Sequence, residues 1–84
     1  MPLFMDVHEK LPEGAKAADV ADAHAADLKI QDRHGVNYVR YWVDEAAGKV
    51  FCLVDAPTAE AAATVHSQAH GLVADRIYEV IEGS

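Results

Sequence analysis

Apolar residues recur with two different periods in this sequence, and each period predicts a different kind of secondary structure. Residues 3–8 alternate with a period of two, which predicts a strand with Leu3, Met5 and Val7 on one face. The opposite face of this strand would carry the three intervening residues, Phe4, Asp6 and His8. The strand therefore has one apolar face and one mixed face.

A period of about 3.6 residues follows and predicts a helix from about Asp19 to Arg33. Asp19 is the expected N-cap, and Gly35 is expected to end the helix. Six residues share the stripe of this helix that is expected to face the core: Ala17, Val20, Ala21, His24, Leu28 and Gln31.

The second half of the sequence predicts a hairpin, a helix and a last strand. Residues 36–44 and 49–55 are rich in β-branched and aromatic residues, and the short loop between them contains glycine, which together predict a β-hairpin. Thr58 is the expected N-cap of an alanine-rich helix that continues to His70. Residues 76–81 predict the closing strand.

This order of elements is typical of the ferredoxin-like fold, an α+β sandwich of βαββαβ topology, in one domain over residues 1–84. Both helices would cover one face of an antiparallel sheet. The open face would then hold Phe4, Asp6 and His8 together with Tyr38, Arg40 and Trp42. Because so small a domain rarely exposes such a half-apolar face, we expect a homodimer around a two-fold axis, a dimeric α/β barrel-like assembly.

Charge and composition exclude several classes of function. Fourteen acidic residues against seven Lys and Arg give a net charge of −7, the wrong sign for binding nucleic acid. The single Cys52 cannot form an internal disulfide, an iron–sulfur cluster or a zinc site made of cysteines alone. No apolar run approaches the ~20 residues that cross a membrane, and the N-terminus lacks the basic start of a secretory signal. We therefore expect a cytoplasmic protein.

The spacing of two histidines points to a metal site. His66 and His70 are one helical turn apart, so both imidazoles can reach one ion, and their small neighbours predict accessible rings. In this topology His8 lies at the same end of the domain, as do Asp44 and Glu45 in the hairpin turn. Imidazole and carboxylate together suit borderline divalent metals. The alternative is two ordinary surface histidines near a helix C-terminus, where the helix dipole favours a positive charge.

Three further residues carry possible chemistry. His24 lies in the middle of the predicted core stripe, where we expect a buried, hydrogen-bonded structural residue rather than a ligand. Asp6 shares a strand face with His8, and the pair suits metal ligands, an interface network or a catalytic pair. Cys52 stands between two large apolar residues, where a cysteine usually acts as a small hydrophobe.

Five segments together resemble a known family. They are Met5–His8, Tyr41–Glu45, Gly48–Val54, Val65–His66 and Ala69–Asp75. In combination, over nearly the whole chain, they are similar to small bacterial nickel-binding proteins long catalogued as a domain of unknown function. The resemblance implies a ferredoxin-like subunit, a homodimer, nickel bound by histidines and acidic groups, and a role in nickel sequestration.

Three hypotheses follow, and the first is our prediction. It is a non-enzymatic nickel-binding protein whose metal residues are His8, His66 and His70, completed by Asp6, Asp44 or Glu45. The second is a dimeric α/β-barrel enzyme that uses Asp6, His8 and Cys52 on a small organic molecule between two sheets. The third is an interaction module with incidental histidines. Converging imidazole nitrogens would favour the first, and a closed apolar cavity with a perturbed acid or base would favour the second.

Overall fold

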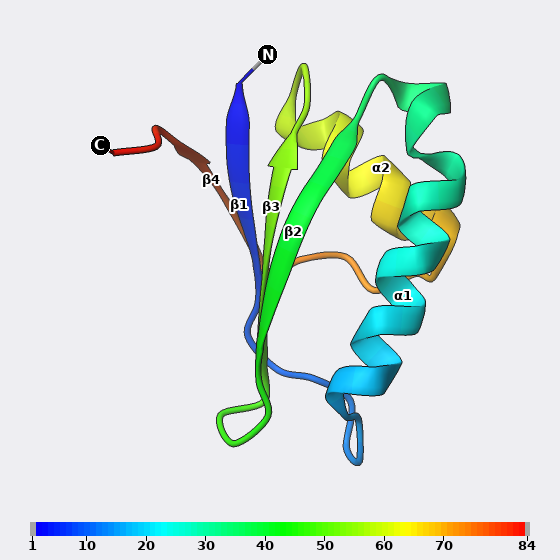
Figure 1. Cartoon of the computed structure of the whole chain (residues 1–84), viewed down its shortest axis with the longest axis vertical. Coiled ribbons are helices and arrows are strands. Elements are labelled where there is room, and N and C mark those ends of the chain that lie inside the picture. Colours follow the sequence, from blue (N-terminus) through cyan, green and yellow to red (C-terminus); the bar gives the residue numbers. More distant parts are fainter. Residues whose placement is uncertain (1, 84) are drawn as a thin grey trace.

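Four strands form one antiparallel sheet, and both helices lie on the same side of it (Figure 1). The computed structural model describes residues 2–83. In chain order the elements are β1 (Leu3–His8), α1 (Ala17–Ile30), the 3-10 helix η1 (Gln31–His34), β2 (Asn37–Asp44), β3 (Lys49–Asp55), α2 (Ala59–Ala69) and β4 (Arg76–Val80). The strand order β2-β3-β1-β4 is compatible with the ferredoxin-like fold, so the predicted α+β class is confirmed. Within the described range, neither helix combines the length and apolar character needed to span a membrane.

The start of α1 differs from the prediction, whereas its end at Gly35 agrees with it. The N-cap position is Lys16 rather than Asp19, because the Asp19 carboxylate reaches back and accepts the backbone N–H of Lys16 at 2.8 Å. The next amide, of Ala17, donates to Glu45 Oε2 at 2.8 Å. At the other end η1 continues the helix by one turn, and Gly35 stops it with a φ of +65°. The hairpin turn and the start of α1 are therefore joined through Glu45.

The face that α1 turns toward the sheet is also different. Leu28, predicted to lie in the core stripe, is 45 % exposed, whereas Asp27 is only 2 % exposed. Val20 and Ile30 pack against the core on the same side as Asp27. The helix is therefore rotated by about one residue from the predicted orientation. In this orientation Asp27 pairs with His66 on α2 and with His70 at the C-cap of α2.

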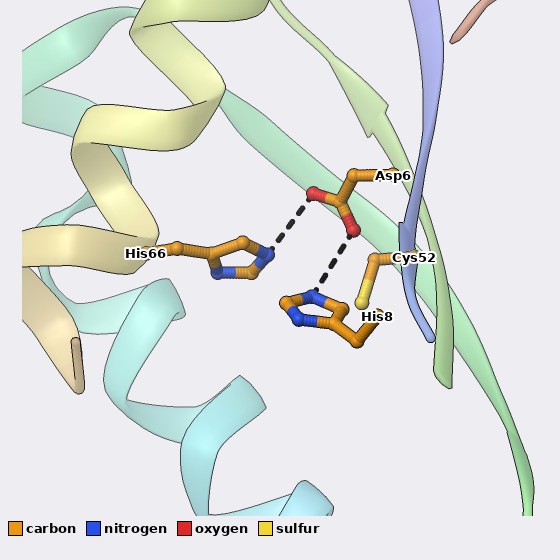
Figure 2. Close-up of side chains that lie close together, drawn as sticks. All are labelled: Asp6, His8, Cys52 and His66. Atoms are coloured by element: carbon orange, nitrogen blue, oxygen red, sulfur yellow. Dashed lines mark ion pairs between the residues drawn. The ribbon is translucent and has the colours of Figure 1, made fainter. Parts of the chain in front are cut away.

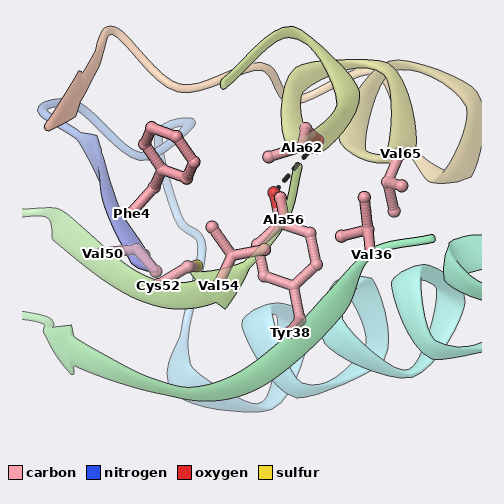
Figure 3. Packing of buried hydrophobic residues seen from close by; sticks show 9 residues of the cluster. All are labelled: Phe4, Val36, Tyr38, Val50, Cys52, Val54, Ala56, Ala62 and Val65. Atoms are coloured by element: carbon pink, nitrogen blue, oxygen red, sulfur yellow. Dashed lines mark hydrogen bonds between the residues drawn. The ribbon is translucent and has the colours of Figure 1, made fainter. Parts of the chain in front are cut away.

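The faces of β1 are exchanged relative to the prediction. Phe4 and Asp6 are 7 % and 0 % exposed and lie beneath the helices (Figure 3 shows Phe4 in the core). His8, two residues further, points the same way toward His66, and the apolar residues between them face the open side of the sheet. The predicted alternation of β1 is confirmed, but its apolar face points away from the core. The face toward the helices instead contributes Asp6 and His8 to a polar cluster.

An irregularity in β2 decides the position of Tyr38. The register with β3 shifts directly after this residue, so Tyr38 faces the helices although the prediction placed it on the open face. Its hydroxyl donates to Asp6 Oδ2 at 2.8 Å and lies 3.1 Å from the carbonyl oxygen of Ala62. After the shift Tyr41 packs against the core and Trp42 is exposed on the other side, as expected.

The two sides of the sheet therefore have different characters. The helix side carries the core, whose buried members are Phe4, Val36, Tyr38, Val50, Cys52, Val54, Ala56, Ala62 and Val65 (Figure 3). By strand register, the open side carries a second apolar set: Leu3, Met5, Val7, Trp42, Phe51, Leu53, Tyr78 and Val80. Trp42 and Tyr78 are each nearly half exposed. We call this second set the open-face patch.

Candidate metal centre

His66 is the centre of a buried polar cluster. It lies on α2, which begins where predicted because Thr58 Oγ1 accepts the backbone N–H of Ala61 at 3.1 Å. The ring is 2 % exposed, so the predicted accessibility of His66 was wrong. It lies between two carboxylates from different elements: Nδ1 is 2.9 Å from Asp27 Oδ1 on α1, and Nε2 is 3.0 Å from Asp6 Oδ2 on β1 (Figure 2 shows the Asp6 side).

A triangle of three donor atoms forms on the α1 side of His66. Its corners are Asp27 Oδ1, His66 Nδ1 and His70 Nε2, and its edges measure 2.9, 3.0 and 3.2 Å. The predicted one-turn spacing therefore does bring both imidazoles to one point. The other ring nitrogen of His70, Nδ1, accepts the backbone N–H of Leu72 at 3.0 Å.

A second group gathers on the β1 side of His66. Asp6, His8, Cys52 and His66 each offer one potential ligand atom, and these atoms lie within 4.8 Å of one another (Figure 2). His8 Nε2 is 3.4 Å from Asp6 Oδ1. Burial and the charge of Asp6 raise the pKa of the Cys52 thiol well above its ordinary value, so this sulfur remains a neutral thiol in the metal-free protein. His66 is shared by both groups.

The electrostatics of the cluster favour one positive ring between two carboxylates. Burial opposes the charge on His66, but the hydrogen bond to Asp27 and the charge of Asp6 outweigh it and raise the pKa of His66 to about 9. Burial likewise opposes the charge on Asp6 and Asp27, yet their contacts with His66 hold the pKa of each carboxyl below its usual range. At neutral pH the metal-free cluster thus contains two carboxylates and an imidazolium.

Two buried atoms of the cluster are not fully satisfied. Asp6 Oδ1 and His66 Nε2 have no hydrogen-bond partner among the described residues, although Asp6 Oδ1 lies 3.4 Å from His8 Nε2 and His66 Nε2 lies 3.0 Å from Asp6 Oδ2. The Asp6–His66 contact is short, but its angle is not that of a hydrogen bond. Unpaired buried polar atoms are costly, and both of these atoms lie on the β1 side of His66.

The structure gathers some of the predicted metal residues and not others. Asp6, His8, His66 and His70 lie in the cluster. Asp44 and Glu45 do not: Asp44 Oδ1 accepts the backbone N–H of Ala47 in the hairpin turn, and Glu45 holds the start of α1. His24 is half buried rather than fully buried, with its ring centroid 4.7 Å from that of Tyr41. Both carboxylates of the hairpin turn thus accept backbone N–H groups, Asp44 within the turn and Glu45 at the start of α1.

Sequence reasoning missed Asp27. This aspartate lies seven residues after Val20 and three before Ile30, which is the spacing of one helix face. The inner stripe would have included Asp27 if a carboxylate had been allowed among its apolar residues. Cys52 is buried, in keeping with the prediction that it acts as a small hydrophobe, and its thiol lies beside the imidazoles. The enzyme hypothesis placed Asp6, His8 and Cys52 between two sheets, whereas all three face the helices.

A cavity of about 340 Å³ opens beside the cluster, between α1, the β1–α1 loop and the sheet. Asp27, His66 and His70 lie in its wall, together with His8 and His24. The triangle of donor atoms therefore borders a space rather than packed side chains.

Comparison with known proteins adds two matches. A family model described as nickel responsive protein SCO4226-like matches residues 4–80, which extend from β1 to the end of β4. The crystal structure of SCO4226 from Streptomyces coelicolor A3(2) is similar over 98 % of this chain and 99 % of that chain, with 38 % sequence identity and a TM-score of 0.88. A comparison with curated proteins gave no match.

Proposed function

Because this chain belongs to the SCO4226-like family of nickel responsive proteins, we propose that it is a non-enzymatic protein that binds and sequesters nickel. Family membership also confirms the resemblance seen in the sequence motifs. In our proposal the ion is bound by Asp27, His66 and His70, with Asp6 supporting His66 from the other side. His8 lies next to the site and does not bind the ion in this proposal.

The observation that carries this proposal is the size of the donor triangle. With bonds of about 2.1 Å, adjacent ligands lie about 3.0 Å apart around an octahedral ion and about 3.4 Å apart around a tetrahedral one. The edges of 2.9 and 3.0 Å match the octahedral spacing, and the third edge of 3.2 Å lies between the two values. Two imidazoles and one carboxylate also suit nickel among the borderline divalent metals.

The charges of the cluster support the same site. The carboxylates of Asp6 and Asp27 are both buried, and in the metal-free protein one imidazolium compensates only part of their charge. A divalent ion that displaces the proton of His66 restores the balance. His66 would bind through Nδ1, and its Nε2, 3.0 Å from Asp6 Oδ2, would need only a small rotation of the ring to donate to that carboxylate and orient the ligand ring.

Calorimetric titration of nickel into untagged protein at pH 8 tests the site. We expect His70→Ala and Asp27→Asn each to weaken nickel affinity by at least tenfold, because each removes a ligand. His34→Ala is the matched control for the first variant and Asp44→Asn for the second, and both should stay within about twofold. Circular dichroism melts of every variant separate a lost ligand from a lost fold.

One comparison distinguishes the two sides of His66. If nickel instead occupied the β1 side, His8→Ala would weaken its binding more than His70→Ala does. Equal nickel affinity in the wild type and in all variants would refute a nickel site in this cluster.

We also propose that two copies pair through the open-face patch into a homodimer. Its eight apolar residues lie on a sheet side that no helix of the described chain covers. Exposed apolar patches of this kind are typical of interfaces, and a two-fold axis lets the same surface serve both copies.

A further inference from the structure

The cavity beside the cluster is large enough for a small molecule, and its wall is mostly apolar. Its volume of about 340 Å³ is within the range of small-molecule sites, and about twice that of a cavity that accommodates benzene. Most of its wall is apolar: Leu11, Pro12, Val20, Ala23, Val50 and Leu72. Tyr41 and His24 add two aromatic rings whose centroids are 4.7 Å apart. An organic molecule with a single ring or a short chain fits this space.

The charges around the cavity select the kind of molecule. Glu13 and Asp19 lie in its wall on the loop and at the start of α1, and Asp27 lies in it at the cluster end. Among the described residues that line the cavity, none is a lysine or an arginine. At neutral pH the positive group in the wall is the His66 imidazolium, and it already pairs with the carboxylates of Asp27 and Asp6. An organic anion would therefore meet carboxylates and no uncommitted cation. An organic cation would meet both acidic groups and aromatic ring faces.

We propose that this cavity is a binding site for a small organic amine whose ammonium group points to Asp27 and whose hydrocarbon part fills the apolar wall. The site does not depend on the nickel centre, although the two share Asp27. The ammonium would approach a carboxylate that is 98 % shielded from solvent by the protein, where a charged hydrogen bond is stronger than in water. Tyr41 and His24 would flank it with their rings.

Three probes of the same shape separate charge from size. Benzylamine, benzyl alcohol and benzoate each carry one ring and one short head group, but they are a cation, a neutral molecule and an anion at pH 7. We would titrate each into metal-free protein and follow the backbone amides by NMR. Benzylamine should bind at least tenfold more tightly than benzoate, with benzyl alcohol between them, and should shift amides of the residues that line the cavity.

Two alanines of α1 provide a matched pair of variants. Ala23 lines the cavity, whereas Ala25 is exposed on the outer side of the same helix. Ala23→Phe should abolish benzylamine binding by filling the space, and Ala25→Phe should leave it unchanged. Glu13→Gln on the exposed loop should reduce the preference for benzylamine over benzyl alcohol without affecting the fold.

Several outcomes would overturn this proposal. They are benzoate binding as tightly as benzylamine, Ala23→Phe leaving benzylamine affinity unchanged, or no binding of benzylamine at concentrations up to about 10 mM. Nickel titration of the same samples keeps the two proposals apart. Benzylamine binding without nickel binding refutes only the metal centre, and nickel binding without benzylamine binding refutes only the amine site.

Discussion

Raising the pH should unfold the metal-free protein more easily, and His66 is the residue responsible. The imidazolium of His66 is stabilised in the fold by Asp27 and Asp6, which raise its pKa from about 6.5 to about 9. A group whose pKa is raised by folding contributes its full stability below the unfolded value. That contribution is lost as the pH rises through the folded value, so the sensitive range extends from about pH 6.5 to about pH 9.

The size of the effect follows from the shift. One pKa unit corresponds to about 1.4 kcal/mol, so moving from pH 6 to pH 9 should remove roughly 3 kcal/mol from the free energy of unfolding. For a domain of this length that is a large share of a total of about 5–15 kcal/mol. It should lower the melting temperature by roughly 10–20 °C.

Urea unfolding of protein dialysed against a chelator, at half-unit steps from pH 6 to pH 9, measures this loss. His66→Gln should flatten the profile, while His34→Gln, a histidine outside the cluster, should keep the wild-type slope. NMR titration of the His66 ring in the wild-type protein measures the same pKa directly and does not depend on whether His66→Gln folds. A free energy of unfolding that changes by less than about 1 kcal/mol over this range, with a His66 pKa near 6.5, would refute the buried ion-pair network.

Four further predictions concern the metal, the loop after α2, the cysteine and the open face. Because nickel displaces the proton of His66, the affinity of the protein for nickel should rise about 50-fold between pH 7 and pH 9. With an unshifted histidine the affinity would level off near pH 6.5, and a nickel affinity that calorimetry finds constant between pH 7 and pH 9 would contradict this prediction. If His70 binds nickel through Nε2, its Nδ1 must carry the proton and cannot accept the Leu72 amide, so nickel should shift that amide in NMR spectra; an unmoved signal argues against His70 as a ligand. Cys52→Ala should keep nickel affinity within a few-fold and cost about 1 kcal/mol in urea unfolding, and lost binding would make the thiol a ligand. Trp42→Arg should shift the mass measured by light scattering from dimer toward monomer, unless the wild-type protein is already monomeric at micromolar concentration.

The secondary structure was predictable because its signals are local. The strand at residues 3–8 and the hairpin follow from residue type and alternation over a few positions. Thr58 and Gly35 mark helix ends through groups that act within three or four residues of themselves. The pairing of His66 with His70 across one helical turn is local in the same sense, and it was predicted for that reason.

Local patterns therefore predicted the order of the elements, most of their ends, the one-turn histidine pair and, through the motifs, the family. Which face of each element points inward depends instead on contacts between distant parts of the chain. Asp27 and His66 are 39 residues apart in the sequence, and no local pattern predicts that the carboxylate of one is buried against the imidazole of the other. Asp6 lies beneath the helices against the same imidazole, and the apolar side of β1 faces outward. A buried charge must be paired, whereas an apolar surface can be covered by another molecule.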